Sequence, residues 1–205
     1  MSIPIQIPGL NEYIQEIPEG NIILFQGGIN PISSIFVKTL AFSAYKEGRK
    51  INYITSKTEE EVEEQLDFFL KGDVSFTIAA ERSHRHWGEY VEEDTVTIFD
   101  SFSYLVLDHP LAEVRRILEE LLRLCKQKNA TIFLTTEQGM LDEKVDTTVC
   151  HLVDCIVLFL SRDTEKGVRR YMRIPKWVFG QSFEDNIYYP FDGKHILIDL
   201  RSRVG

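Results

Sequence analysis

The sequence predicts an α/β fold, a three-layer α/β/α sandwich around a mainly parallel central sheet. Three observations lead to this prediction. Apolar segments alternate with segments of helical periodicity, several apolar segments are continuous, and a polar turn joins two strand-like segments near the end of the chain. Continuous apolar runs are typical of parallel strands buried on both faces, and a hairpin adds antiparallel strands at the sheet edge.

The first two-thirds of the chain predict repeated strand–helix units. In the first predicted helix, Asn30 is a good N-cap, Pro31 suits the first turn and Gly48 suits the C-terminal stop. Thr58 and Glu61 have the spacing of a capping box at the start of the second helix. Strands are predicted at residues 21–26, 51–56, 74–80, 95–101 and 130–136, and helices at residues 31–48, 57–72 and 110–128.

The helix predicted at 110–128 has the clearest amphipathic pattern, and Pro110 suits its first turn. One face is predicted to carry Leu111, Val114, Leu118, Leu121, Leu122 and Cys125. A short helix at 143–153, a hairpin of 155–162 with 167–176, and a last strand at 195–200 complete the prediction. Since the chain shows neither a linker nor an internal repeat, residues 1–205 are predicted to form one domain.

Composition restricts the classes of function. The 205 residues carry a formal net charge of −9, and an acidic surface disfavours nucleic-acid binding. No apolar run reaches the roughly 18 residues that predict a membrane span, and the first residues lack the regions of a signal peptide. Together with Cys125, Cys150 and Cys155 read as free thiols, these features predict a cytoplasmic protein.

The stretch GGINPISS, residues 27–34, lies between a predicted strand and a predicted helix. A phosphate loop with the pattern GxxxxGK[ST] would lie at such a junction. Gly28 is taken as the first glycine of the pattern. Ile32 then stands in place of the second glycine, Ser33 in place of the lysine and Ser34 in place of the hydroxyl residue.

These replacements weaken a phosphate site. The β-branched Ile32 resists the left-handed backbone conformations that glycine adopts. Ser33 lacks the positive charge of lysine, and one charge-assisted hydrogen bond is worth roughly 1.5–3 kcal/mol. Lys38 lies roughly 7 Å further along the helix axis and is expected not to replace the lysine. Two interpretations stay open here: a phosphate loop without its charge, and an ordinary strand-to-helix turn that Asn30 and Pro31 begin.

Five longer stretches carry a family resemblance: IPGLNEYIQEIPEGNIILFQGG at 7–28, TVTIFDSFSYL at 95–105, ATIFLTTEQGML at 130–141, RRYMRIPKWVFG at 169–180 and YYPFDGKHILI at 188–198. In their order and spacing they resemble the RecA-like ATPases, in particular the KaiC branch with its archaeal relatives in signalling and the archaellum, with 95–105 as the Walker B strand. The resemblance implies a RecA-like P-loop NTPase fold and covers nearly the whole chain.

The resemblance also implies a site for ATP and Mg²⁺. Ser34 and Asp100 would be the metal ligands, and Lys176 would act on the nucleotide of a neighbouring subunit. The implied nucleotide-binding residues are Gly27, Gly28, Ser33, Ser34, Asp100 and Lys176.

The sequence departs from the family pattern at positions that carry the chemistry, namely Ile32, Ser33, Lys57, Thr58 and Val178. Lys57 and Thr58 stand where acidic residues would activate the attacking water, and Val178 stands where an arginine would reach a neighbouring nucleotide. The predicted function is therefore a catalytically inactive homologue that acts in signal transduction as a regulatory or protein-interaction domain. A protein partner or a homo-oligomer is expected.

Two alternatives remain open. An ATP-binding protein or weak ATPase would use the backbone of residues 27–33 together with Ser34, Asp100 and Mg²⁺. A recombinase-paralogue-type partner would bind DNA, which the net charge of −9 disfavours.

The polar segment 81–94 is predicted to be a solvated loop. Within it, Arg82–Trp87 could bind a phosphate, a nucleic-acid backbone or, through His84 and His86, a metal, although two such histidines alone are weak evidence for a metal site. Cys155 is expected to begin a buried strand and not to join a metal site with Cys150 and His151. Arg169 and Arg173 are expected to share one face of a strand.

Overall fold

The structure is a computed structural model that describes residues 2–28, 32–70, 76–80, 84–165, 167–180 and 182–191. Its centre is an eight-stranded sheet with the strand order β10-β9-β8-β3-β7-β6-β4-β5. Neighbouring strands are parallel from β8 to β5, whereas β9 is antiparallel to both β8 and β10. The strands are β3 (Ile22–Gly27), β4 (Ile51–Thr55), β5 (Thr77–Ala79), β6 (Val96–Asp100), β7 (Thr131–Glu137), β8 (Cys155–Thr164), β9 (Gly167–Trp177) and β10 (Phe183–Tyr188). The predicted sheet is therefore confirmed.

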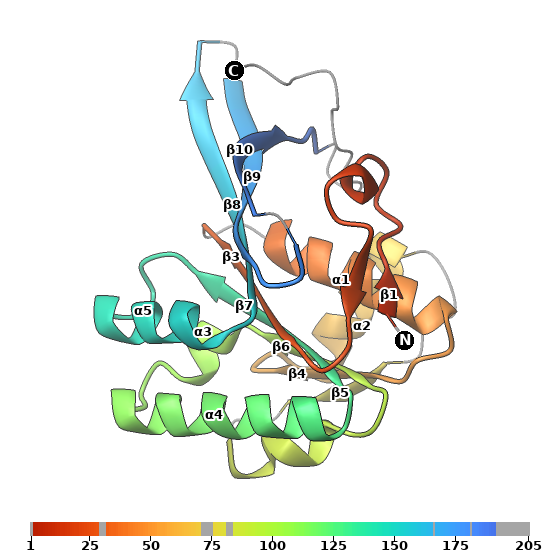
Figure 1. Cartoon of the computed structure of the whole chain (residues 1–205), viewed down its shortest axis with the longest axis vertical. Helices are drawn as coiled ribbons and strands as arrows, with labels where there is room; N and C mark the ends of the chain where they lie inside the picture. The colour runs from red at the N-terminus through yellow and green to blue at the C-terminus, as the bar shows by residue number, and fades with distance from the viewer. Residues whose placement is uncertain are drawn as a thin grey trace.

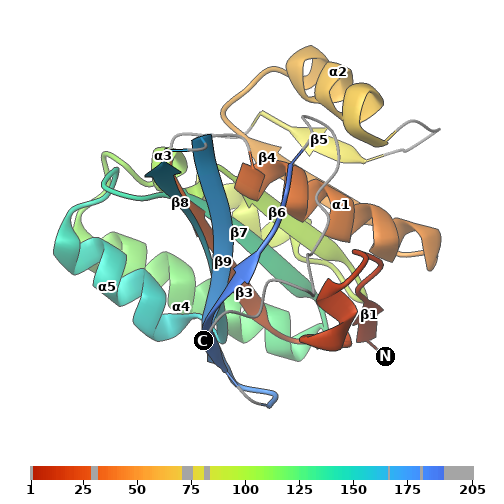
Figure 2. The same ribbon diagram turned by 90° about the horizontal axis from the view of Figure 1, so that it is seen from above.

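Helices cover both faces of this sheet, as the three-layer prediction requires. The helices are α1 (Ile32–Lys46), α2 (Glu59–Leu70), α3 (Phe102–Leu105), α4 (Leu111–Gln127) and α5 (Glu143–Leu152). Helices α1 and α2 lie on one side of the sheet, and α4 and α5 lie on the other (Figures 1 and 2). The hairpin of β8 and β9 extends beyond the body of the sheet (Figure 1).

Strand β3 shows why continuous apolar runs form the central strands. Ile23 and Phe25 pack in the apolar cluster that includes α1 and α2, whereas Ile22 and Leu24 pack in the cluster that includes α4 and α5. Each of the four side chains is at most 1% exposed. Because successive side chains of a strand point to opposite faces, a strand between two helical layers needs an apolar residue at every position.

Local signals set the helix boundaries. Gly48 follows α1 with φ of 84°, a left-handed conformation that glycine adopts at little cost. At the start of α2, the backbone N–H of Glu61 donates to Oγ1 of Thr58 at 3.3 Å, and the backbone N–H of Thr58 donates to Oε2 of Glu61 at 2.9 Å. The predicted capping box is therefore confirmed. Asn30 and Pro31, which were predicted to begin α1, lie outside the described residues.

Helix α4 buries most of its predicted face. Leu111, predicted to be buried, is 38% exposed because it is the first residue of the helix, at the end of the packed face. Pro110 precedes the helix as its N-cap residue and does not lie in the first turn. Leu122 is partly buried, and the fully buried residues are Val114, Ile117, Leu118, Leu121 and Cys125.

Several elements were not predicted. Strands β1 (Ser2–Pro4) and β2 (Glu16–Pro18) form a separate antiparallel pair with the short helix η1 (Leu10–Glu12) between them, and β10 and α3 are also additional. The last strand predicted at 195–200 lies outside the described residues. Of the strand predicted at 74–80, residues 76–80 are described, and β5 covers Thr77–Ala79 of them. No helix within the described ranges is long and apolar enough to cross a membrane.

The prediction of a solvated loop at 81–94 is partly wrong, because residues 84–90 of it form the 3₁₀ helix η2 (His84–Tyr90). Trp87 is 1% exposed, and its ring centroid lies 5.2 Å from that of Phe99 and 6.1 Å from that of Phe102. The large apolar area of one indole ring outweighs its polar neighbours in deciding burial.

We expect Leu118→Ala to lower the free energy of unfolding by about 2–5 kcal/mol, because it leaves a cavity in the core. Leu111→Ala, on the same helix but 38% exposed, is the matched control and should cost less than about 1 kcal/mol. Urea denaturation followed by circular dichroism measures both variants. Equal losses would contradict the assignment of the buried face of α4.

Candidate phosphate-binding cleft

A cleft of about 840 Å³ opens at the carboxyl ends of the parallel strands. The first turn of α1 and the ends of β4, β6 and β7 contribute its walls. Ligands of open α/β sheets bind at this edge, so the predicted site residues Ser33, Ser34 and Asp100 lie where a ligand is expected. The charged and hydroxyl groups that line it include Ser33, Ser34, Lys38, Lys57, Asp100 and Glu137.

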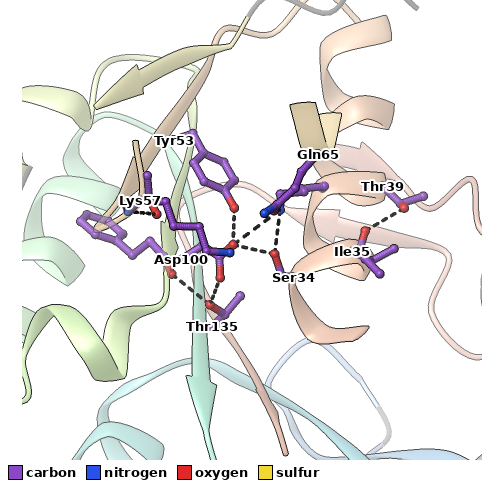
Figure 3. A network of polar contacts seen from close by, with 11 residues as sticks. Ser34, Ile35, Thr39, Tyr53, Lys57, Gln65, Asp100 and Thr135 are labelled. Atoms are coloured by element: carbon purple, nitrogen blue, oxygen red, sulfur yellow. Dashed lines mark hydrogen bonds and ion pairs between the residues drawn. The ribbon is translucent and has the colours of Figure 1, made fainter. Parts of the chain in front are cut away.

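Asp100, at the end of β6, is the centre of a hydrogen-bond network in this cleft (Figure 3). Its Oδ1 accepts a hydrogen bond from the hydroxyl of Thr135 at 2.7 Å. Its Oδ2 accepts from the hydroxyl of Ser34 at 2.6 Å and from the hydroxyl of Tyr53. Donors from β7, α1 and β4 thus hold one carboxylate that is 5% exposed.

Lys38 also reaches this network, which corrects the prediction that it is too distant. Its Nζ lies 2.9 Å from Oγ of Ser34, 2.8 Å from Oε1 of Gln65 and 3.8 Å from Oδ2 of Asp100. Lys38 and Ser34 are four residues apart and therefore share a helix face. Helical side chains point back toward the N-terminus, so the rise of the backbone overstates the distance from the amine to the cleft.

Burial and charge shift the pKa values of these groups. Burial lowers the pKa of the Lys38 amine to about 8, although the Asp100 carboxylate opposes this shift. Burial by itself would raise the pKa of Asp100, but Lys38 and the hydroxyls of Ser34, Tyr53 and Thr135 hold that pKa below its ordinary value. Burial, reinforced by Asp100, raises the pKa of Tyr53 well above its ordinary value. At neutral pH the cleft therefore contains a buried ammonium–carboxylate pair.

The shift of Asp100 links the cleft to stability. Because the pKa of Asp100 is lower in the folded chain than in the unfolded chain, the ionised carboxylate stabilises the fold above its unfolded-state pKa. This contribution is lost as the pH falls through the lower folded-state value.

Glu137 is a second carboxylate in the cleft that the sequence prediction missed. It ends β7, and its Oε2 accepts hydrogen bonds from the hydroxyls of Ser101, at 2.5 Å, and Ser103. One signal could have identified it, because Glu137 follows a continuous apolar strand, as Asp100 does. Acidic residues at the carboxyl ends of parallel strands meet at one edge of the sheet.

The glycines of the candidate phosphate loop lie at the end of β3 and just after it. Counted back from Ile32, the four-residue spacing of the motif falls on Gly27, so the assignment of Gly28 as its first glycine is wrong. A Cβ placed on Gly27 would lie 3.5 Å from Oγ of Ser33, so this glycine is close to the start of α1. Residues 29–31 lie outside the described residues, and phosphate binding by the loop backbone stays a prediction.

Comparison with known proteins decides the family. The family model for KaiC-type ATPases matches residues 80–188, more than half of the chain. The chain belongs to the KaiC family of ATPases. No match is found among curated proteins.

Solved structures support the RecA-like fold of this KaiC-family chain. It is similar to the flagellar accessory protein FlaH from Methanocaldococcus jannaschii, with a TM-score of 0.78, 18% identity and coverage of 97% of this chain and 98% of that chain. It is also similar to the KaiC-like protein PH0186 from Pyrococcus horikoshii OT3, with a TM-score of 0.77, 15% identity and coverage of 97% and 99%.

The position after β4, where the KaiC resemblance implies an acidic residue, carries a cation in this chain. Lys57 lines the cleft. The side chain of Thr58 instead takes part in the capping box with Glu61. The cleft therefore has a positive side chain where a base would be expected.

Lys176 does not line the cleft. Its Nζ donates to the carbonyl oxygens of His151 at 2.8 Å and Cys150 at 3.2 Å, and a cation is favoured at such a helix C-terminus. It pairs with Ile156 of β8, and three strands, β8, β3 and β7, separate its strand β9 from β6, which ends in Asp100. Val178, which stands where the resemblance implies an arginine, is 55% exposed. The role of Lys176 toward the nucleotide of a neighbouring subunit stays a prediction.

The structure groups His84 with His109 and Glu113, and not with His86. Nδ1 of His84 lies 3.1 Å from Nε2 of His109, and Nε2 of His84 lies 3.2 Å from Oε1 of Glu113. These three residues could offer ligand atoms to a metal, but the guanidinium of Arg116 also lies 3.2 Å from Nε2 of His84. We therefore interpret the group as a hydrogen-bond network that ties η2 to α4.

The cysteines follow the prediction of free thiols. Cys155 begins the buried strand β8 as expected, and burial raises the pKa of Cys125 and of Cys155 to about 12. Within the described part of the chain, Cys150 and His151 do not belong to a metal-binding group.

The arginines of β9 contact β10. Arg169 lies over the ring of Tyr188, 5.4 Å from its centroid, and Arg173 donates a hydrogen bond to Asn186 at 2.9 Å. Both side chains thus help to hold the antiparallel edge of the sheet.

We expect Tyr53→Phe to lower the free energy of unfolding by about 1.5–3 kcal/mol, because it removes a hydrogen bond to a buried carboxylate. Tyr45→Phe is the matched control, since Tyr45 packs its ring against Phe76 and should change stability by less than about 0.5 kcal/mol. Chemical denaturation at neutral pH measures both. If the two variants are equally stable, the hydroxyl of Tyr53 does not hold Asp100.

Proposed function

We propose that this chain is a KaiC-family domain that does not hydrolyse ATP efficiently and acts as a regulatory domain through contacts with other proteins. The observation that carries the proposal is Lys57 in the cleft. A lysine ammonium has donors but no acceptor, so it cannot take a proton from an attacking water as a general base must.

Two further features of the cleft support this proposal. Ser33 lines the cleft in place of the lysine that the motif requires, and a hydroxyl cannot neutralise phosphate charge. Glu137 is a carboxylate, but the hydroxyls of Ser101 and Ser103 already donate to its Oε2. Lys57 therefore stands where the resemblance implies a base, and Ser33 stands where the motif requires a cation.

Exposed apolar side chains support a protein partner or a second copy of the chain. Val178 is 55% exposed and Phe179 is 38% exposed after the end of β9, and Val168 is 50% exposed near its start. Contiguous exposed apolar groups favour contact with another protein surface, and Val178 and Phe179 are neighbours in the chain. One of the similar structures is described as an accessory protein, which supports an accessory role here as well.

We expect the purified chain to release phosphate from Mg-ATP no faster than its Asp100→Ala variant. A phosphate-release assay measures both, with Asp108→Ala, an exposed residue outside the cleft, as the matched control. Ser34→Ala is a second test variant, because Asp100→Ala also removes structural hydrogen bonds. Fast release that is lost in both cleft variants and kept in Asp108→Ala would contradict the proposal.

Nucleotide binding without efficient hydrolysis is a second candidate function. It is favoured by the size of the cleft and by the hydrogen bond of 2.6 Å between Ser34 and Asp100, two of the nucleotide-binding residues that the resemblance implies. A ligand that binds the folded chain and not the unfolded chain would raise the free energy of unfolding by RT ln(1 + [L]/Kd).

For this candidate we expect ATP at about 100 times its Kd to stabilise the chain by about 2.7 kcal/mol. The melting temperature should then rise by roughly 5–10 °C for a chain of this size. Differential scanning fluorimetry measures the shift, and adenosine, which lacks phosphates, is the control ligand. An unchanged melting temperature at millimolar ATP would eliminate this candidate.

A further inference from the structure

The ammonium of Lys38 is surrounded by acceptors although it lies in a cleft that is open to ligands. Its Nζ is 2.8 Å from Oε1 of Gln65, 2.9 Å from Oγ of Ser34 and 3.8 Å from Oδ2 of Asp100. The ring of Tyr53 lies beside it, with its centroid 5.4 Å from Nζ. Lysine has three donors and no acceptor, so these oxygens and the aromatic ring match what a buried cation requires.

A magnesium ion would need the same oxygen atoms. Mg²⁺ binds oxygen ligands at 2.0–2.1 Å in near-octahedral geometry. The hydroxyl of Ser34 donates its proton to Asp100 and accepts from Lys38, so one of its two lone pairs faces the ammonium and a metal on the other would lie close to that positive charge. Both oxygens of Asp100 already accept hydrogen bonds from hydroxyl groups.

The residues present therefore do not fit magnesium as the family resemblance implies. A divalent ion near Ser34 and Asp100 would meet the positive charge of Lys38 at close range, where like charges repel strongly. Lys38 is 1% exposed, and withdrawing its ammonium would leave Asp100 as a buried charge without its cation, which is strongly unfavourable.

We infer that the ammonium of Lys38 takes the place of the divalent metal, so that the cleft binds a phosphate-bearing anion such as a nucleotide without Mg²⁺. Lys38, about one helical turn further along α1, supplies the positive charge that Ser33 lacks. The ligand part of this inference rests on nucleotide binding, the second candidate function above. Lys57 at the wall of the cleft adds a second cation for the same ligand.

The first test compares ATP binding to the unmodified chain by isothermal titration calorimetry, once with excess Mg²⁺ and once with excess EDTA. The two dissociation constants should agree within about threefold, less than 1 kcal/mol of binding free energy. Binding that weakens more than about tenfold in EDTA, equivalent to 1.4 kcal/mol, would overturn the inference and leave nucleotide binding intact.

The second test is Lys38→Met, which keeps the length of the buried stem and removes the charge. We expect ATP affinity in EDTA to fall at least about tenfold, and Mg²⁺ to restore part of it. Lys46→Met is the matched control, because Lys46 is exposed on the same helix and lies over the ring of Phe42. Equal affinities of Lys38→Met and Lys46→Met in EDTA would overturn the inference. If Lys38→Met does not fold, the comparison on the unmodified chain decides alone.

A third measurement separates this inference from the nucleotide-binding proposal. If ATP binds neither with Mg²⁺ nor with EDTA, the nucleotide-binding proposal fails. Whether Lys38 or a divalent metal is the cation beside Asp100 is then decided by titrating the ligand-free chain with Mn²⁺ and measuring free Mn²⁺ by electron paramagnetic resonance. Absence of bound Mn²⁺ supports Lys38 as the resident cation. Mn²⁺ that binds the unmodified chain and is lost in Asp100→Asn would overturn it.

Discussion

A carboxylate that is taken out of water must be hydrogen-bonded and close to a cation, or it loses its charge. Asp100 meets this requirement with hydroxyl groups of Ser34, Tyr53 and Thr135 and with the ammonium of Lys38. These groups come from α1, β4 and β7, so the charge of one side chain fixes the relative positions of three neighbouring elements. The shape of the cleft depends on this arrangement.

The edge of the sheet that carries Asp100 is the part of this KaiC-family fold on which the proposed loss of hydrolysis depends. The sheet brings α1 and the ends of β4, β6 and β7 together around the cleft, as in an α/β protein that binds ligands at its carboxyl edge. The charges at that edge differ from those the family resemblance implies. Lys57 is at the place of an acid, and the amine of Lys38 lies beside the predicted metal ligands. A cleft with these charges favours holding an anion over activating a water molecule.

Much of the fold could be predicted because its signals are local. Continuous apolar runs identified β3, β4, β6 and β7, and the capping box at Thr58 and Glu61 set the start of α2. The signals failed where burial is decided by distant residues. Trp87 lies in a polar segment and is buried against residues distant in the chain, such as Phe99 and Phe102. The small sheet of β1 and β2 was also missed, because each of its strands is only three residues long and has no apolar pattern that would predict it.

By itself the sequence determined the central strands and the longer helices of the sandwich, that Asp100 ends a central strand, and that the phosphate motif lacks its lysine. These properties depend on residue type and spacing along the chain. Only the tertiary structure decided that Lys38 reaches the cleft, that Glu137 joins it, and that Lys176 lies outside it on a strand separated from β6 by three others. The reason is that strand pairing and the direction of long side chains, and not distance along the backbone, set which charges meet.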